Sequence, residues 1–283
     1  MADKPNRASG YPTGQVEIVR ATCLYVATKL GDLANETVIV GGLVPSLLID
    51  QTKVGGPEHR HAGTLDLDVG LALAILDHHR YQALTERLRL AGFSQDETDE
   101  GKPTRQRWKI AGPPRMTVDF LIPPSLPTDR PGSLRSIESD FAAIIAPGLH
   151  LAFVDRQQVR LDGKTILGEL ATRDVWVAGP GSYLVLKALA FKSRGANKDA
   201  YDLFYVLRYF GAGIDEVVAR LVPLLDDASA QEALTVLESD FSNIESLGPR
   251  RVAEFVHGRR DDDLQADVRG IVLDLVARCR EKR

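Results

Sequence analysis

Apolar residues recur along this chain with two periods, and the pattern changes near Pro180. Before that point, short apolar or alternating runs typical of strands are interleaved with stretches in which apolar residues return every three or four positions, as in helices. After it, only the helical period remains. The sequence therefore predicts an α+β fold with a mixed sheet in the N-terminal part and a helical region at the C-terminal end.

The elements expected from these patterns follow in chain order. Strands are expected at 37–40, 64–73, 105–111, 116–122, 149–161 and 174–177. Helices are expected at 16–33, 77–91, 183–192, 197–210, 214–225, 230–241, 249–256 and 264–283. A further helix is expected to begin directly after Gly41-Gly42. Glycines 92 and 195 should end two of these helices, Asn197 should cap the next, and Gly112-Pro113-Pro114 is typical of a hairpin turn. The charged segment 96–102 is expected to be a solvated loop.

The chain is long enough for one large domain or two smaller ones, with 283 residues. We expect a sheet-based domain at 15–125 and a mostly helical region at 126–283, with a soft boundary within 123–181. The sequence contains no internal repeat.

Composition places few limits on function. The hydrophobic fraction of 44% excludes global disorder, and the net charge of −4 gives no overall electrostatic case for nucleic acid. Cys23 and Cys279 stand in helix-like apolar patterns and are expected to be buried thiols, not a disulfide. With neither a signal-peptide pattern nor a run of membrane-spanning length, a cytoplasmic, soluble protein is expected, with no membrane partner.

The strand at 64–69 reads Thr-Leu-Asp-Leu-Asp-Val, and its period of two turns Asp66 and Asp68 toward one face. Like charges at neighbouring positions of one face destabilise a sheet, and a polyvalent cation between them would remove that cost. Carboxylates are the ligands that Mg²⁺ prefers, often together with substrate phosphates. The alternative is an exposed face of an edge strand, which the flanking apolar residues disfavour.

Two further features belong with this pair. Gly41 and Gly42 stand between a buried strand and a helix, where a phosphate could approach the backbone N–H groups, with Ser46 one turn further along. A plain strand-to-helix turn is the alternative interpretation. Asp119 lies in the apolar strand at 116–121 and can join the pair if the two strands are neighbours. Three carboxylates near such a turn indicate two-metal phosphoryl transfer.

This order of motifs resembles the nucleotidyltransferases of the DNA polymerase beta type. The order is Gly-Gly, a helix, Thr-x-Asp-x-Asp and a later strand aspartate. The long gap before the Asp pair and the pattern of the second half are similar to the AbiEii branch, which includes toxins of type IV toxin–antitoxin systems and the MenT enzymes. Thr64 matches the hydroxyl of that branch, whereas Gly63 stands where arginine is usual, and Arg60 or His61 could replace it.

The second half resembles the same branch in a helix lysine, an arginine and a Lys-Asp-x-x-Asp-Leu segment. By this resemblance Lys187 and Asp202 are expected to be required for activity, and Arg194 and Lys198 to contact the nucleotide. From the residues alone, a lysine can reach triphosphate oxygens as a point charge, and Asp199 or Asp202 could orient the basic groups. Helix capping, a packing ion pair and an ordinary basic loop are the alternatives.

The resemblance implies a nucleotidyltransferase core that uses two Mg²⁺ ions and an NTP. Asp66 and Asp68 would hold both ions, Asp119 would complete the ion site near the attacking hydroxyl, Gly41 and Gly42 would hold the triphosphate, and Ser46 and Thr64 would assist. The implied acceptor is a tRNA 3′ end, the implied role that of a toxin or phage-defence effector, and a cognate antitoxin an implied partner.

Two other functions remain open. One is transfer to a small molecule such as an antibiotic, or to a protein hydroxyl, and the other is a non-catalytic module that binds a partner. The histidines have no zinc-ligand spacing and are interpreted as loop or surface residues, with His61 a candidate for substrate contact.

Overall fold

The computed structural model describes residues 4–72, 78–98, 100–110 and 116–282, which form two compact units. The sheet unit consists of Thr13–Val44 and Gly63–Ala178, and the helical unit of Lys4–Pro12, Pro45–Ala62 and the chain from Gly179 onward. The predicted α+β class, with a mixed sheet followed by helices, is confirmed. Residues 134–178 add strands to the sheet, and the chain passes from the sheet unit to the helical unit between residues 178 and 179.

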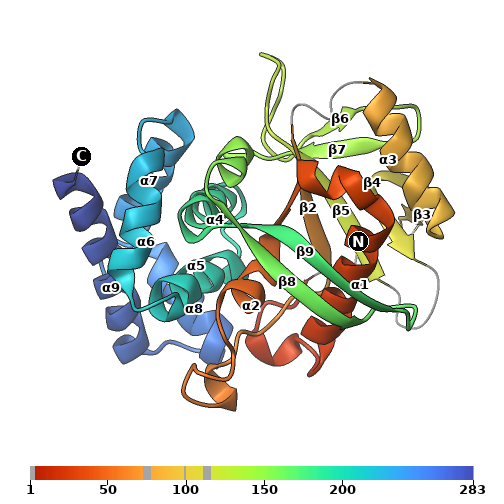
Figure 1. Cartoon of the computed structure of the whole chain (residues 1–283). Helices are drawn as coiled ribbons and strands as arrows, with labels where there is room; N and C mark the ends of the chain where they lie inside the picture. Colours follow the sequence, from red (N-terminus) through yellow and green to blue (C-terminus); the bar gives the residue numbers. More distant parts are fainter. Residues whose placement is uncertain (1–3, 73–77, 99, 111–115, 283) are drawn as a thin grey trace. The chain divides into compact units, whose positions relative to one another are not determined.

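Nine strands within the described residues form one mixed sheet (Figure 1). They are β1 Thr37–Val40, β2 Leu67–Leu71, β3 Phe93–Glu97, β4 Pro103–Ile110, β5 Met116–Ile122, β6 Leu134–Ser136, β7 Ala142–Ile145, β8 Arg156–Lys164 and β9 Leu170–Ala178. The order along the sheet is β3-β4-β5-β2-β1-β9-β8, and β7 pairs with both β5 and β6. The all-buried Thr-Val-Ile-Val run of β1 is typical of a central strand covered on both faces.

The register of three neighbouring strands places polar residues side by side. Strand β2 is antiparallel to β1 and parallel to β5, and it pairs Asp68 with Asp119. Strand β4 is antiparallel to β5 and pairs Arg107 with the same Asp119. Residues directly opposite each other on paired strands project from the same face, so these three side chains share one face of the sheet.

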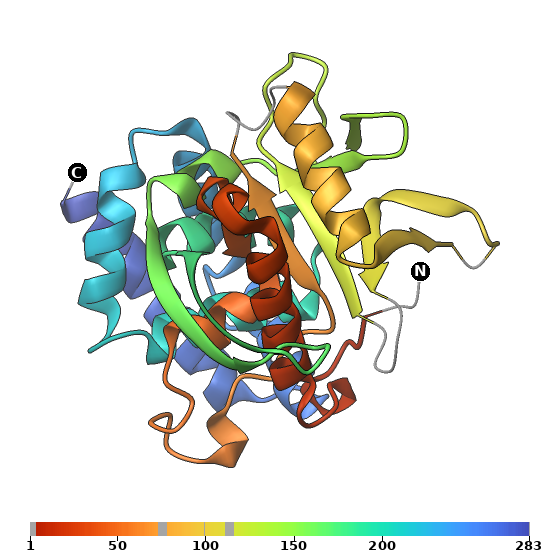
Figure 2. The same cartoon turned by 45° about the vertical axis from the view of Figure 1, so that its right-hand side comes forward.

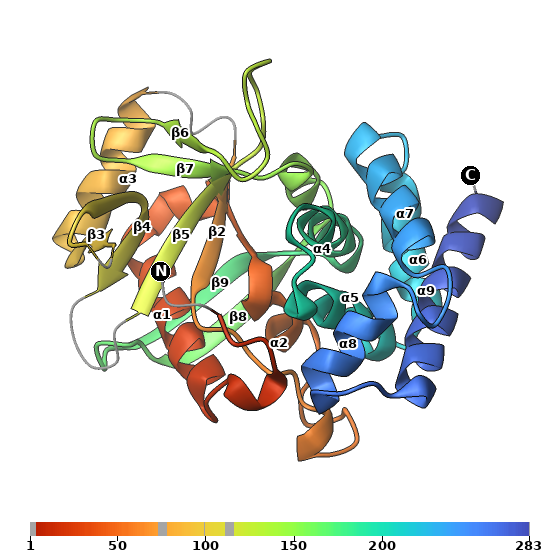
Figure 3. The same cartoon turned by 180° about the vertical axis from the view of Figure 1, so that it is seen from behind.

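The other face of β2 is covered by a helix. Helix α1, Gln15–Leu30, buries residues at helical spacing, and its Cys23 and Val26 line the same small cavity as Val69 of β2. Because neighbouring residues of a strand point to opposite faces, Asp68 points away from α1. Helix α3, His78–Leu90, lies on the α1 side of the sheet (Figure 2). Seen from behind, β2 and β5 run side by side in front of these helices (Figure 3).

Parts of the sheet differ from the prediction. The short strands β3, β6 and β7 were not expected, and segment 96–102, expected to be a solvated loop, begins inside β3. Asp96 there is only 7% exposed, because β3 pairs with β4. Residues 149–153, expected to start a strand, form a 3-10 helix, since a short apolar run does not distinguish the two structures. The predicted turn at 112–114 and the predicted element ends at 73 and 77 lie outside the described residues.

The helical unit contains the helices that the second half of the sequence predicts. They are α4 Pro180–Arg194, α5 Asn197–Tyr209, α6 Ile214–Leu221, α7 Ala228–Asp240, α8 Leu247–His257 and α9 Asp262–Glu281, and the short α2, Val44–Leu48, leads into the unit from β1. Gly195 ends α4 with a φ of 59°, as expected. Asn197 is the first residue of α5, and Ala196 takes the capping position that we expected for Asn197.

Two further expectations concern the cysteines and the membrane. Cys23 and Cys279 are both buried and free, as predicted. In the part of the chain that the structure describes, the helices are too short or too polar to span a bilayer.

Candidate functional site

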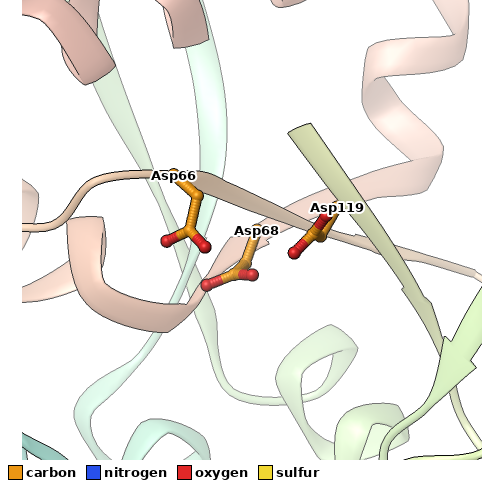
Figure 4. Close-up of side chains that lie close together, drawn as sticks. All are labelled: Asp66, Asp68 and Asp119. Carbon is orange, nitrogen blue, oxygen red and sulfur yellow. The ribbon is translucent and has the colours of Figure 1, made fainter. Parts of the chain in front are cut away.

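The three strand aspartates converge, as the sequence predicted. Asp66 directly precedes β2, Asp68 lies within it, and Asp119 lies in β5. One carboxylate oxygen of each lies within 4.8 Å of one oxygen of each of the others, and Figure 4 shows the three carboxylates gathered on the same side of the strands. Asp66 and Asp119 are buried, with 3% and 4% exposed, and Asp68 is half-buried. We call these residues the carboxylate triad.

Thr64 holds the first member of the triad. Its hydroxyl contacts the Asp66 carboxylate Oδ1 at 3.1 Å and the Asp66 main-chain oxygen at 3.3 Å, and it is itself buried. The hydroxyl expected to assist nucleotide binding therefore contacts a metal-ligand candidate in this structure. A hydroxyl that donates to a carboxylate fixes its orientation, so Thr64 positions Asp66.

Gly41 makes room for the second member. It has a φ of 71°, a left-handed conformation, and a Cβ at this position would lie 1.8 Å from Oδ2 of Asp68. Only glycine satisfies both the backbone conformation and this close approach. Gly42 is buried in the 3-10 helix Gly41–Leu43 that follows β1. The glycine turn is therefore fitted to the triad.

Arg107 contacts the third member and was missed in the sequence analysis. Its Nε donates to Asp119 Oδ1 at 2.7 Å and its Nη2 to Oδ2 at 2.5 Å. The same Nη2 lies 3.5 Å from Oδ2 of Asp66. These hydrogen bonds to Asp119 raise the pKa of Arg107, so it is charged. The signal was present: Arg105, Arg107 and Lys109 alternate with Trp108 and Ile110 along β4, which predicts one basic face.

The donor set of the triad fits a hard divalent cation. Mg²⁺ binds oxygens at about 2.0–2.1 Å in octahedral geometry, so two oxygens on one ion are about 2.9 Å apart when adjacent and about 4.2 Å apart when opposite. Oxygens that already lie within 4.8 Å of one another need side-chain movements of at most about 2 Å to reach these spacings. Asp66, Asp68 and Asp119 are thus able to hold a metal ion, and two dications about 3.5–4 Å apart are also a known arrangement between carboxylates.

A second group of predicted residues forms a buried charge cluster in the helical unit. At its centre is Asp202 of α5, which is fully buried. Lys187 of α4 lies 2.7 Å from its Oδ2, and Lys198 lies 2.5 Å from its Oδ1. Lys187 is 7% exposed and also contacts Asp199 at 3.2 Å. A carboxylate without exposure is stable as an anion only with such partners.

His61 belongs to this cluster. Its Nε2 lies 2.8 Å from Oδ1 of Asp202, and its ring stacks on Tyr201 with a centroid distance of 5.4 Å. A carboxylate only accepts hydrogen bonds, so Nε2 carries the proton of the neutral ring. Burial is the main reason why the pKa of His61 falls from 6.5 to about 4. With a side chain only 1% exposed, His61 is packed inside the unit and, in this structure, does not present its ring for the substrate contact that the sequence suggested.

The two lysines differ because their partners differ. Burial lowers the pKa of a lysine, but the two carboxylates of Asp202 and Asp199 outweigh it at Lys187, whose pKa is raised. Burial prevails at Lys198, whose nearest carboxylate is Asp202, and the pKa of Lys198 is lowered. Burial acts against ionisation of Asp202, but Lys187 and Lys198 outweigh it and hold its pKa well below the usual value.

Arg194 and Asp199 form the outer part of the cluster. Arg194 donates from Nε to Oδ2 of Asp199 at 2.6 Å and from Nη2 to Oδ1 at 2.8 Å. Asp199 is buried, whereas the Arg194 side chain is 61% exposed. Asp199 therefore makes the packing ion pair that the sequence analysis kept as an alternative, and Arg194 is the group of this cluster that solvent reaches most.

The predicted site residues thus fall into two groups, each inside one unit. The sheet unit contains Gly41, Gly42, Thr64, Asp66, Asp68 and Asp119. The helical unit contains Lys187, Arg194, Lys198 and Asp202, together with Ser46, which is half-buried in α2. Arg107 in the first group is the residue that the sequence analysis did not find.

Comparisons with known proteins give a limited result. No protein-family model matches the sequence, and no curated protein is similar to it. A solved structure of an antigenic nucleotidyltransferase-like protein from Paracoccidioides brasiliensis is similar over 81% of this chain and 92% of its own, with 16% sequence identity and a TM-score of 0.41. A likeness at this level does not assign an activity to the chain.

Proposed function

We propose that this protein is a metal-dependent nucleotidyltransferase that moves a nucleoside monophosphate from an NTP to an acceptor hydroxyl. The observation that carries the proposal is the carboxylate triad, in which Asp66, Asp68 and Asp119 bring three oxygens within 4.8 Å of one another. The fitted turn at Gly41 supports it, because a side chain there would displace Asp68. Like-charged groups gathered in this way repel one another, and a bound divalent cation would offset that repulsion.

In the proposed reaction, the acceptor oxygen forms a bond to the α-phosphorus of the NTP. The bond from that phosphorus to the bridging oxygen breaks, and pyrophosphate leaves. Asp119 accepts the proton of the acceptor hydroxyl, in the orientation that Arg107 fixes, while Thr64 holds Asp66 and Gly41 leaves room for Asp68. Two Mg²⁺ ions held by the triad would activate the hydroxyl and neutralise charge on the phosphate oxygens.

The helical unit contributes cationic groups to this proposal. Lys187 is proposed to neutralise phosphate charge, and Asp202 to orient it, since the two lie 2.7 Å apart. Arg194 and Lys198 are proposed as nucleotide contacts, and Arg194 has the exposure that such a contact requires. Gly42 and Ser46 are proposed to bind the triphosphate through the start of the helix that follows β1.

The proposed acceptor is the 3′ end of a tRNA, and the proposed role is that of a toxin or phage-defence effector controlled by a cognate antitoxin. The order of motifs supports this choice: the glycine turn and Thr-x-Asp-x-Asp lie in the sheet unit, and Lys-Asp-x-x-Asp-Leu lies in the helical unit. Modification of the 3′ end would block aminoacylation. RNA binding should weaken steeply as salt is raised, whereas a small acceptor should depend little on salt.

The test is a labelling reaction with each of the four α-³²P-labelled NTPs, Mg²⁺ and total bacterial RNA. The wild type should label RNA of tRNA size, and the double variant Asp66→Asn/Asp68→Asn should not. Asp155→Asn is the matched control, because Asp155 is a buried carboxylate of the same unit outside the triad, and it should retain activity.

Other outcomes separate the rival functions. Label in a small hydroxylated compound or in protein, without label in RNA, would support a nucleotidyltransferase but contradict the proposal that its acceptor is tRNA. Absence of label from every acceptor class, with no metal bound by the wild type, would contradict the proposal and favour a module that only binds a partner.

A further inference from the structure

Arg107 is placed against the triad by the register of the sheet. It lies opposite Asp119 across the β4–β5 pair, and its guanidinium forms two parallel hydrogen bonds to that carboxylate, at 2.7 and 2.5 Å. Its Nη2 is also 3.5 Å from Asp66. The side chain is 15% exposed, against 4% and 6% for the Asp66 and Asp119 side chains. Arg107 is therefore a largely desolvated cation inside the carboxylate group.

The charges of these four groups do not balance. Three carboxylates and one guanidinium carry a net charge of −2. The guanidinium supplies part of the positive charge that the triad needs, and it supplies it at Asp119 and Asp66, two of the three residues that could bind a metal ion. A dication and Arg107 thus act on the same oxygens. Two cations close together repel each other strongly in a partly desolvated site.

We propose that Arg107 is a built-in counter-cation of the triad, which stabilises the carboxylates in the absence of divalent ions and weakens the binding of those ions. This inference rests on the proposed metal site and adds a positioning residue to it. Hydrogen bonds to both oxygens of Asp119 do not prevent metal binding, because a carboxylate oxygen offers more than one lone pair. The hydrogen bonds from Arg107 reduce the electrostatic attraction between the Asp119 carboxylate and a metal ion, which favours release and exchange of the metal.

A purely structural ion pair makes a different prediction. If Arg107 only holds β4 against β5, its removal should weaken the fold or loosen Asp119, and metal affinity should fall or stay unchanged. If Arg107 is a counter-cation, its removal changes the net charge of these groups from −2 to −3, and metal affinity should increase. The sign of the change in affinity separates the two.

The experiment measures Mn²⁺ binding by the EPR signal of the free ion, and thermal unfolding with chelator and with Mn²⁺. Arg107→Gln, which removes the charge, should bind Mn²⁺ about tenfold more tightly than the wild type. Arg107→Lys, which retains the charge but not the two parallel hydrogen bonds, should remain within about threefold. The Arg107→Gln melting temperature should be lower than that of the wild type in chelator and recover on addition of Mn²⁺, because a ligand stabilises the state that binds it.

Arg135→Gln is the matched control. Arg135 is also 15% exposed in its side chain and also contacts both oxygens of one aspartate, Asp129, whose side chain is 5% exposed and which is outside the triad. Its loss should lower stability without changing Mn²⁺ affinity and without recovery by Mn²⁺. Unchanged or weaker Mn²⁺ binding by Arg107→Gln, with the wild type binding normally, would overturn this inference alone. Absence of Mn²⁺ binding by both proteins would overturn the proposed metal site as well.

Discussion

The Asp68 carboxylate occupies the space that a side chain on residue 41 would require. A Cβ on Gly41 would lie 1.8 Å from Asp68 Oδ2 and 2.6 Å from its carboxyl carbon. The φ of 71° at Gly41 already disfavours other residues, and the approach of Asp68 excludes them sterically. The glycine turn after β1 and the position of Asp68 on β2 therefore depend on each other. The predicted glycine motif and the predicted metal ligands are in direct contact at this point.

We predict that Gly41→Ala displaces Asp68 and reduces Mn²⁺ affinity at least about tenfold, with a loss of stability of about 1–3 kcal/mol. Gly92→Ala is the control, because Gly92 has a φ of 81° but no heavy atom within 4 Å of the added Cβ. Gly92→Ala therefore introduces the same kind of backbone strain as Gly41→Ala but no steric clash with another side chain. Mn²⁺ binding and urea unfolding measure the two effects, and equal Mn²⁺ affinity of the two variants would show that Asp68 accommodates the side chain.

Divalent ions should stabilise the wild type and not the triad variants. At a free Mg²⁺ concentration about 100 times the dissociation constant, one bound ion adds about 2.7 kcal/mol to the free energy of unfolding. We expect Asp68→Asn to lose this increment, because one of three carboxylates is neutralised, and Asp155→Asn to keep it. Thermal unfolding with and without Mg²⁺ measures the increment, and an equal increase in Asp68→Asn would place the ion elsewhere.

The sheet register explains how much of the site could be predicted. Period two in the sequence placed Asp66 and Asp68 on one face of the predicted strand, and that expectation is independent of long-range contacts. The position of Asp119 required β5 to lie next to β2, which is a property of the strand order, so the sequence could state it only as a condition. The contact between Arg107 and Asp119 requires a third strand and its register, and it became visible only in the fold.

In the helical unit, too, the sequence predicted the local elements but not the contacts between distant segments. The helix patterns around Lys187 and Asp202 were sufficient to predict α4 and α5, because apolar spacing is a local signal. They did not indicate that His61, more than a hundred residues earlier, packs against Asp202 inside this unit. Burial of a charged cluster depends on which segments cover it. His61 was therefore expected to lie in a loop with access to substrate, whereas its side chain is enclosed.

The buried His61 predicts a loss of stability at acidic pH. Its pKa is about 4 in the folded protein, against 6.5 for an unperturbed histidine. Between these values the unfolded chain binds a proton that the folded protein does not, so the free energy of unfolding falls as pH is lowered from 6.5 to 4. The full effect is about 3 kcal/mol, at about 1.4 kcal/mol for each unit of pKa difference.

The measurement is the free energy of unfolding in urea at several pH values. His61→Gln, which can still donate to Asp202, should lose less stability than the wild type over this interval. His59→Gln should follow the wild type, since the His59 side chain in the same segment is 52% exposed. Parallel curves for His61→Gln and the wild type would mean that the pKa of His61 is the same in the folded and the unfolded protein.

Two lysines of helix α4 provide a comparison of buried and exposed ion pairs. Lys187 contacts Asp199 and Asp202 in the interior, whereas Lys192 pairs with Glu232 at 2.6 Å with about half of each side chain exposed. Lys187→Met should destabilise the protein by about 3–5 kcal/mol, because it removes one partner of a buried carboxylate pair. Lys192→Met should change stability by at most about 1 kcal/mol, as exposed ion pairs contribute little. Urea unfolding of both variants at neutral pH tests this difference.

A small effect at Lys187 would mean that Lys198 and Arg194 alone neutralise the two aspartates, and Lys187 would then be dispensable for the fold. In that case any loss of nucleotidyl transfer in Lys187→Met would be due to chemistry and not to folding.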